Sequence, residues 1–412
     1  MVNPLSGDSK IRHFSFLPPV LPSRGIKTWQ IVFGLGFFLW LVLLSLKLSG
    51  VIPREPIAEA LWWLTAINFL IGILVIYGSC EALVEGADNL SLLLKWDSFI
   101  AGTVGEILTL LPELVIIFLL IRINPYLSFL IAIVCIYNNA LAFSVYSFLL
   151  PKDLRGRYLM PESVTRAGTE VLIAGSGIAL VLGLVMIALG LNTETAVLDE
   201  PDLLIVGIAL LGIFLFYLHS LFKYYSHTSK LDETSAKFHS TEETGVGARR
   251  LVTWASTIFF LVIGAIGARI GGEAASSIGD ALLNSFHLPL IPSALILAFF
   301  GSIDEYVVVF QAHRQKLMGI ALSNIFGGIT QVMFLVVPFT LILIAVSGLL
   351  GFVDGSIPIN FVTTVVVILL FPVFFVLFEY LEEDHTLNNL DAAGMLGIFI
   401  LILYVLLFMS WL

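Results

Sequence analysis

The sequence predicts an all-α protein that crosses a membrane about eleven times, and three observations lead to this prediction. Hydrophobic residues make up 58% of the 412-residue chain and charged residues only 12%, whereas soluble domains are about 25% charged. Apolar runs long enough to cross a hydrocarbon core of ~30 Å recur along the chain, and the mean hydropathy is +1.02. The runs lack the alternating pattern of a membrane β-barrel, which favours helices.

The apolar runs also predict how the chain is organised. A polar segment, residues 1–28, precedes an extra helix at 29–49, and a polar linker at 223–249 separates a first unit, 57–222, from a second, 250–412. The expected spans lie near residues 29–49, 57–80, 98–121, 127–149, 171–191, 203–222, 250–271, 291–312, 318–346, 359–381 and 393–412.

The positions of the cations predict the orientation of these spans. With a cytoplasmic N-terminus, the inner segments hold 16 of the 20 Lys and Arg residues. Only Lys47, Arg54, Arg122 and Arg269 then lie outside. Because Lys and Arg accumulate on the cytoplasmic side, this arrangement is the favoured one, and we expect the protein in the cell membrane.

An internal repeat emerges when the sequence is laid over itself with a shift of 192 residues. The match runs without a gap over about residues 57–149, and it is persuasive because rare polar residues coincide. The matched pairs are Glu81 with Glu273, Asp88 with Asp280, Glu113 with Glu305, Arg122 with Arg314, and Asn139 with Gln331. Five spans separate the start of the first unit from the start of the second. Because this number is odd, the two units cross the membrane in opposite directions, and we expect two five-helix repeats of inverted topology. In secondary transporters such repeats place the substrate site near the bilayer midplane.

Glu113 and Glu305 are the main candidate site residues because each lies inside an apolar span. A carboxylate at that depth costs about 2.5–3.5 kcal/mol by insertion scales unless it faces the bundle interior and finds a partner. Two such carboxylates balance one divalent cation, and with other oxygens they suit Ca²⁺. The same oxygens suit Na⁺, and each carboxylate alternatively takes a proton because burial raises its pKa.

Neighbouring polar residues extend the candidate ligand set. Pro112 and Gly105, and Gly301 with Ser302, predict an interrupted helix at each glutamate. Hydroxyl and amide groups at membrane depth then complete the oxygen shell: Thr109, Ser302, Asn138, Asn139, Ser323, Asn324 and Gln331.

The stretches Thr109–Glu113, Ser302–Glu305 and Ser323–Gly328 resemble the motifs of the cation/Ca²⁺ exchanger superfamily. The resemblance covers about 93 residues of each half. It implies alternating-access exchange of Ca²⁺ for Na⁺ or H⁺, with the two glutamates as ion ligands and no cofactor. Leu110 stands where the first motif has Ser, and Asp304, which we include among the candidate ligands, stands where the second has Pro. In the first copy Ile136-Tyr137-Asn138-Asn139 replaces the Gly-Ser-Asn pattern, so these departures concern ion selectivity more than the fold.

Glu106 is a second candidate for the first repeat. It shares a Gly-x-x-x-Glu spacing with Glu305, as in the proton-coupled branch of the superfamily. The ungapped register favours Glu113 as the partner of Glu305. Glu106 lies two turns earlier on the same helical face, where it would serve as a second ligand or proton acceptor.

Two other classes of function are weighed against the exchanger. A passive channel would use similar oxygens arranged in a ring, which an inverted repeat does not favour. An intramembrane enzyme would use buried acids, but the sequence has no nucleophile elbow, His-Glu metal motif or phosphate loop. Cys80 and Cys135 both fall in apolar spans, which argues against a disulfide framework and a Cys-based metal site. The scattered cations give no nucleic-acid footprint, so the expected partners are the transported ions and the lipid bilayer.

Overall fold

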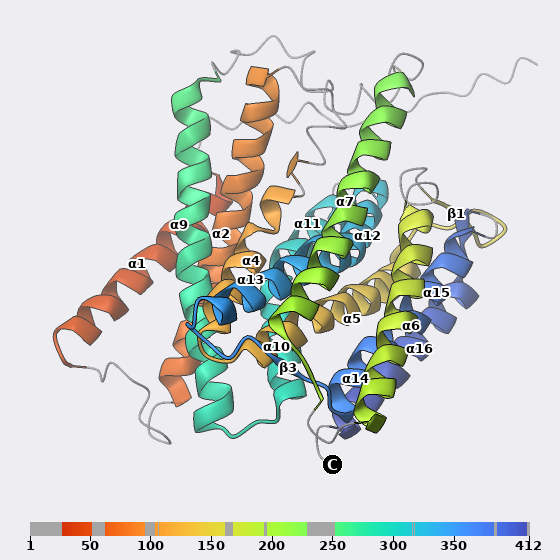
Figure 1. Ribbon diagram of the computed structural model, residues 1–412. Helices are drawn as coiled ribbons and strands as arrows, with labels where there is room; N and C mark the ends of the chain where they lie inside the picture. Colours follow the sequence, from red (N-terminus) through yellow and green to blue (C-terminus); the bar gives the residue numbers. More distant parts are fainter. Residues whose placement is uncertain are drawn as a thin grey trace, which may run out of the picture.

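The computed structural model describes residues 27–51, 62–94, 104–105, 107–160, 168–192, 196–228, 252–314, 316, 318–382 and 385–409. Helices dominate this part of the chain (Figure 1). The first half contains α1 (Thr28–Leu48), α2 (Trp62–Leu94), α4 (Leu111–Ile121), α5 (Pro125–Leu149), β1 (Tyr158–Leu159), α6 (Thr169–Asn192), β2 (Val197–Leu198) and α7 (Glu200–Thr228). The second half contains α9 (Trp254–Asp280), η2 (Ala281–Ser285), α10 (Leu290–Gly301), α11 (Ile303–Arg314), α12 (Met318–Gln331), η3 (Val332–Val336), α13 (Val337–Leu349), β3 (Ile357–Pro358), α14 (Phe361–Ile368), α15 (Leu370–Glu382), β4 (Thr386–Leu387) and α16 (Asn389–Met409).

These helices confirm the predicted class of an all-α polytopic membrane protein. Among the described residues, nine helices are long and apolar enough to cross a membrane, and the bent pair α10 and α11 makes a tenth. The third expected span is present as a shorter apolar helix, Ile107–Ile121, because the beginning of that span lies outside the described residues. The count of eleven therefore stays a prediction.

The helices α2, α7 and α9 continue well beyond the apolar runs from which the spans were predicted. The helix α2 extends to Leu94 and α9 to Asp280, so Glu81, Glu85 and Asp88 lie on one continuous helix. The helix α7 extends to Thr228, into the expected linker, whose remainder lies outside the described residues. Helix propagation is favourable once a helix exists, so hydropathy alone does not mark where these helices end.

The pairing of the short strands supports a two-fold relation between the halves. Strand β1 pairs antiparallel with β4, and β2 pairs antiparallel with β3. In the first half β1 precedes α6 and β2 follows it, and in the second half β3 precedes α14 and β4 follows α15. Each strand that precedes these helices therefore pairs with the strand that follows them in the other half. This exchange is what a two-fold axis produces. Strands β1 and β3 lie at opposite ends of the helices (Figure 1), as inverted repeats require.

Two arginines repeat the same local contact in both halves. Arg122 lies over the ring of Phe118 at 5.6 Å, and Arg314 lies over Phe310 at 5.8 Å. Both pairs are related by the register of the sequence repeat. Each is a cation–π contact at the C-terminal end of a helix, where a positive charge is favourable.

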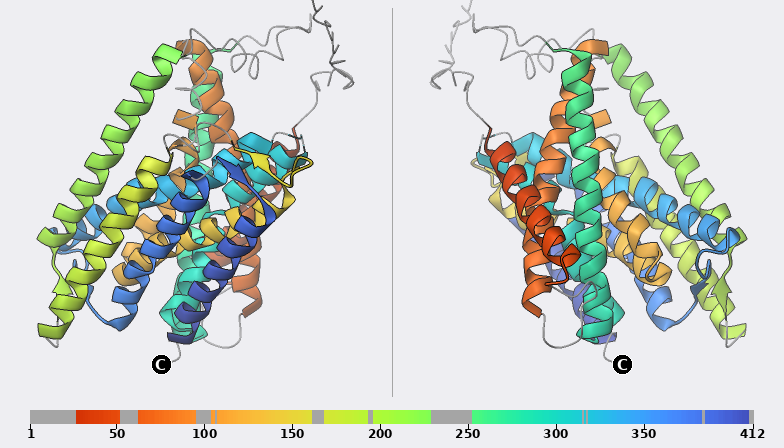
Figure 2. Two further views of the ribbon diagram at one scale, coloured as in Figure 1. Left: turned by 90° about the vertical axis from the view of Figure 1, so that its right-hand side faces the viewer. Right: turned by 90° about the vertical axis from the view of Figure 1, so that its left-hand side faces the viewer.

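The first helices of the two units, α2 and α9, pack side by side and antiparallel (Figures 1 and 2). Glycines allow the close approach. A Cβ at Gly72 would lie 3.0 Å from the Cβ of Ala274, and one at Gly264 would lie 2.5 Å from the Cγ of Leu83. At the same contact the hydroxyl of Ser79 donates to the carbonyl of Gly264 at 2.6 Å. Small residues at such contacts are typical of membrane helix pairs.

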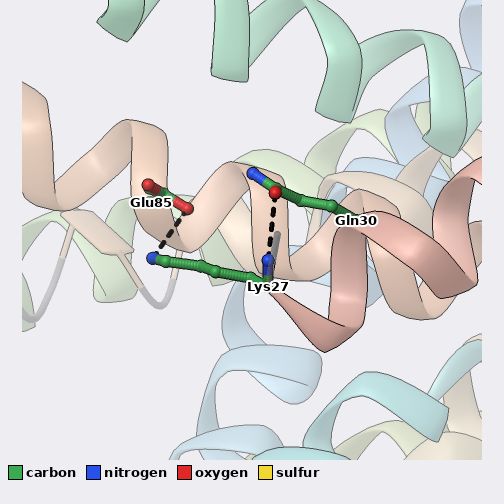
Figure 3. A network of polar contacts seen from close by, with 3 residues as sticks. All are labelled: Lys27, Gln30 and Glu85. Atoms are coloured by element: carbon green, nitrogen blue, oxygen red, sulfur yellow. Dashed lines mark hydrogen bonds and ion pairs between the residues drawn. The ribbon is translucent and has the colours of Figure 1, made fainter. Parts of the chain in front are cut away.

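The extra helix α1 lies across α2 and α9, as the right-hand view of Figure 2 shows. The ring of Phe33 occupies space left open by Gly78 of α2 and Gly267 of α9. At the start of α1, Lys27 forms an ion pair with the buried Glu85 at 3.0 Å (Figure 3). The contact gives the buried carboxylate a positive partner, which a charge removed from water requires.

The close contact between α2 and α9 predicts that added volume at Gly264 lowers the stability of the protein. In Gly264→Ala the added carbon would also lie 3.2 Å from the carbonyl oxygen of Ser79, so the helices must separate. We expect a loss of about 1–3 kcal/mol, measured as a lower unfolding temperature of the purified protein in detergent. Gly177→Ala in α6 is the matched control, because nothing lies within 4 Å of a Cβ at that position. Equal unfolding temperatures for the two variants would contradict the close packing.

Candidate cation-binding site

Both candidate glutamates lie in the first turn of a helix that begins at an interruption. The helix α4, which carries Glu113, starts after a turn at Leu110 and has Pro112 in its first turn. The helix α11, which carries Glu305, starts after Ser302, where it is bent by 51° from α10. Leu110 and Ser302 are equivalent in the sequence repeat. The positive N-terminal end of each helix dipole therefore stabilises a negative charge at each glutamate.

Both glutamates are buried. The exposed fraction is 4% for Glu113 and 8% for Glu305. They also belong to helices that are apolar at most other positions. Their burial agrees with the expectation that intramembrane acids face the interior of the helix bundle.

The carboxylate of Glu305 lies directly against the backbone of Gly328 on α12. A Cβ at Gly328 would be 2.5 Å from Oε1 and 2.7 Å from Oε2 of Glu305. The same point is 2.7 Å from Nδ2 of Asn139, which belongs to α5 of the other half. The two carboxylate oxygens and the amide thus converge from two repeats on one small volume.

The thiol of Cys135 on α5 connects this volume to Glu113. The side chain has an exposed fraction of 0% and interacts with the carboxyl group of Glu113 and, electrostatically, with that of Glu305. It also contacts the carbonyl of Ala298 on α10 at 3.9 Å. Because one buried thiol interacts with both carboxylates, the two glutamates lie near the same small region.

Cys135 is not among the site residues that the sequence predicts. The residue type suggested only a buried apolar position, because the pattern of a Cys-based metal site is absent. The spacing of Cys135 could have indicated its position, since it precedes Asn138 and Asn139 by three and four residues. Residues so spaced share one face of a helix.

Several buried polar atoms in this region make no hydrogen bond within the described part of the chain. They are both amide atoms of Asn139 and Nδ2 of Asn138. A buried polar group without a partner costs about 1–3 kcal/mol. A bound cation with its water molecules would supply partners for oxygens here, and the amides can rotate to present either oxygen or nitrogen.

The remaining predicted ligands are placed less directly. The amide of Asn324 donates to the backbone carbonyl of Glu305 at 3.4 Å, so it supports the helix start. Gln331 is buried on α12, one turn after Gly328, and Thr109 is half-buried just before α4. Ser323 is half-buried on α12. Glu106 and the side chain of Asp304 lie outside the described part of the structure.

The described residues contain no group of three or more His, Cys, Asp and Glu side chains placed to hold a metal ion. The described candidate site therefore combines two carboxylates with amide, hydroxyl and backbone oxygens. Such a set of hard oxygen donors suits Ca²⁺ or Na⁺ better than a transition metal.

Comparisons with known proteins bear on the family and on the fold. The family model of the sodium/calcium exchanger protein matches residues 252–408. No protein of curated function matches the chain by sequence.

Solved structures share the fold over nearly the whole chain. The H⁺/Ca²⁺ exchanger CAX superposes with a TM-score of 0.65 at 12% identity, covering 93% of this chain and 92% of that one. The protein YfkE gives a TM-score of 0.60 at 14% identity, covering 92% and 99%. The sodium–calcium exchanger NCX_Mj gives 0.51 at 18% identity, covering 82% and 97%.

At these identities the structural matches show a shared fold. They extend over both halves, and the family model adds a sequence match to the half that contains Ser302, Glu305 and Gly328. The family match confirms the resemblance found in the motifs for residues 252–408, and the chain as a whole shares the fold of these exchangers.

Proposed function

We propose that this protein is a secondary active antiporter that exchanges Ca²⁺, or a related divalent cation, for Na⁺ or H⁺ by alternating access. The observation that supports this proposal best is that two buried carboxylates, Glu113 and Glu305, one from each half of the chain, both interact with the thiol of Cys135. Their combined charge balances one divalent ion. The family model and the structural relatives are named for ion exchange, not for an enzymatic reaction.

The inverted repeat supplies the mechanical basis for alternating access. Each half contributes one glutamate at the start of an interrupted helix, and the two units meet along the α2–α9 contact. In inverted-repeat transporters, one repeat moves against the other around a fixed site, which then opens to each side in turn. A passive channel would need a continuous path, whereas these carboxylates are buried.

Two coupling ions fit the same site. CAX is named as an exchanger of H⁺ for Ca²⁺ and NCX_Mj as a sodium–calcium exchanger. Carboxylates that release a divalent ion can accept either a proton or a sodium ion in its place. The deciding experiment must therefore offer both gradients separately.

We expect Glu113→Gln and Glu305→Gln each to lower gradient-driven ⁴⁵Ca²⁺ uptake into proteoliposomes at least about tenfold, because each removes a charged ligand. The measurement compares an imposed Na⁺ gradient with an imposed H⁺ gradient, and the one that drives uptake identifies the coupling ion. The matched control is Glu379→Gln, which changes an exposed carboxylate near the end of α15 and should leave uptake unchanged. Uptake driven by neither gradient, or full activity in both site variants, would refute the proposal.

The cation distribution also gives a prediction for orientation. We infer a cytoplasmic N-terminus, which places the loop at Leu154 inside the cell and the loop at Phe352 outside; both side chains are exposed, at 108% and 75%. A membrane-impermeant maleimide should therefore label Phe352→Cys in intact cells and Leu154→Cys only after permeabilisation. The native Cys80 and Cys135 are buried and give little background. Labelling of both positions from the same side would contradict inverted repeats.

A further inference from the structure

A cavity of about 130 Å³ lies between the extra helix α1 and the paired helices α2 and α9. The three helices cross one another in this part of the molecule, as the right-hand view of Figure 2 shows. Each of them contributes side chains to the wall of the cavity. Neither Glu113 nor Glu305 lines it, so the cavity is separate from the candidate cation site.

Four polar side chains line this cavity: Lys47 of α1, Asn68 of α2, and Glu273 and Ser277 of α9. The rest of the wall is apolar, and most of it comes from α1. A pocket that combines hydrocarbon with a few charged and hydrogen-bonding groups suits a ligand with an apolar part and a polar part.

Asn68 is the most buried of the four polar residues, with an exposed fraction of 9%. Its side-chain amide has no hydrogen-bond partner among the residues that the structure describes. Burial of a polar group without a hydrogen bond is unfavourable. We therefore expect a polar occupant in the cavity.

Lys47 and Glu273 line the cavity with opposite charges, yet they do not form an ion pair with each other. In the described part of the chain, Glu273 pairs with Arg269 at 2.8 Å, and Lys47 has no acidic partner. The bond from Arg269 uses Oε1 of Glu273, which leaves Oε2 available to a ligand. Two opposite charges that line one cavity without pairing complement a ligand that carries both charges.

The cavity lies near one surface of the membrane. Lys47 is in the last turn of α1, and Glu273 follows the apolar run that predicted a span at 250–271. A lysine at the end of a span extends its ammonium into the headgroup layer. The volume corresponds to about four water molecules at ~30 Å³ each, which suits a small headgroup.

We propose that this cavity binds the headgroup of a phosphatidylethanolamine molecule from the surrounding membrane. The phosphate accepts hydrogen bonds from the ammonium of Lys47 and the amide of Asn68, and the ammonium of the lipid donates to Oε2 of Glu273. The acyl chains lie against apolar side chains of α1. The lipid thereby links α1 to α9 at a place where Lys47 and Glu273 form no direct ion pair. This inference is independent of the proposed antiport function.

The test measures lipid binding to the full-length protein, purified in detergent and stripped of lipid, by native mass spectrometry and by the unfolding temperature. Phosphatidylethanolamine, phosphatidylcholine and phosphatidylglycerol with identical acyl chains are compared. We expect phosphatidylethanolamine to bind at least about fivefold more tightly than the others, because only its headgroup combines a phosphate with an ammonium that donates hydrogen bonds. It should also raise the unfolding temperature most, because a ligand of the folded state stabilises that state.

Two variants assign the charges. Lys47→Gln should weaken binding of phosphatidylethanolamine at least about fivefold, because it removes a charged partner of the phosphate. Glu273→Gln should abolish the preference for phosphatidylethanolamine over phosphatidylcholine, because it removes the acceptor of the ammonium. Arg155→Gln and Glu379→Gln are the matched controls, since both residues are exposed and neither lines the cavity. Size-exclusion profiles establish that each variant is folded, and the comparison of lipids on the wild type tests the proposal even where a variant fails to fold.

The inference is overturned if the three lipids bind equally or if Lys47→Gln binds phosphatidylethanolamine as the wild type does. Tighter binding of phosphatidylglycerol would show a site for anionic lipid and would also overturn it. Free phosphoethanolamine should compete only weakly; competition at concentrations similar to those of the lipid would identify a soluble zwitterion as the ligand and overturn the lipid assignment. Because no ion gradient is used, these outcomes do not depend on whether the protein transports Ca²⁺.

Discussion

The structure depends on one constraint: two carboxylates must be kept inside a bundle of apolar helices. Burial of an unpaired charge is expensive, and the fold offsets that cost locally. Each glutamate lies in the first turn of a helix, where the helix dipole favours a negative charge. Interrupted helices are tolerated at this depth only where protein surrounds them or they line a cavity, so the interruptions at Leu110 and Ser302 mark the same region as the charges.

Inverted duplication explains how one chain assembles this region. Each repeat supplies a glutamate and a following helix with a buried amide side chain, and the glutamate of the second repeat and the asparagine of the first both lie against Gly328. The exchanged strand pairs, the paired arginine contacts and the antiparallel α2–α9 packing all obey the same two-fold relation. A site shared between two repeats can open alternately to each side when they move, which a site within one repeat could not do.

Much of this could be predicted from the sequence, because hydropathy and rare polar residues are strong signals in an apolar chain. The span positions, the 192-residue register and the two glutamates all came from such signals. The rest depends on contacts between distant segments. The ion pair of Lys27 with Glu85 joins residues 58 positions apart, and the adjacency of Cys135 to both carboxylates requires α4, α5 and α11 to be placed in space. The ends of α2, α7 and α9 could not be read from hydropathy, because a helix does not stop where its apolar run stops.

The two halves have diverged unequally around a shared packing. Small residues form the contacts between α2 and α9 in both halves. In the second half the backbone of Gly328 closely approaches the carboxylate of Glu305. The family model matches the half that contains Gly328, while Leu110, Cys135 and Ile136 depart from the motif in the other. Both halves nevertheless keep a buried glutamate in the first turn of a helix that begins at an interruption, so this feature has outlasted the divergence of the side chains around it.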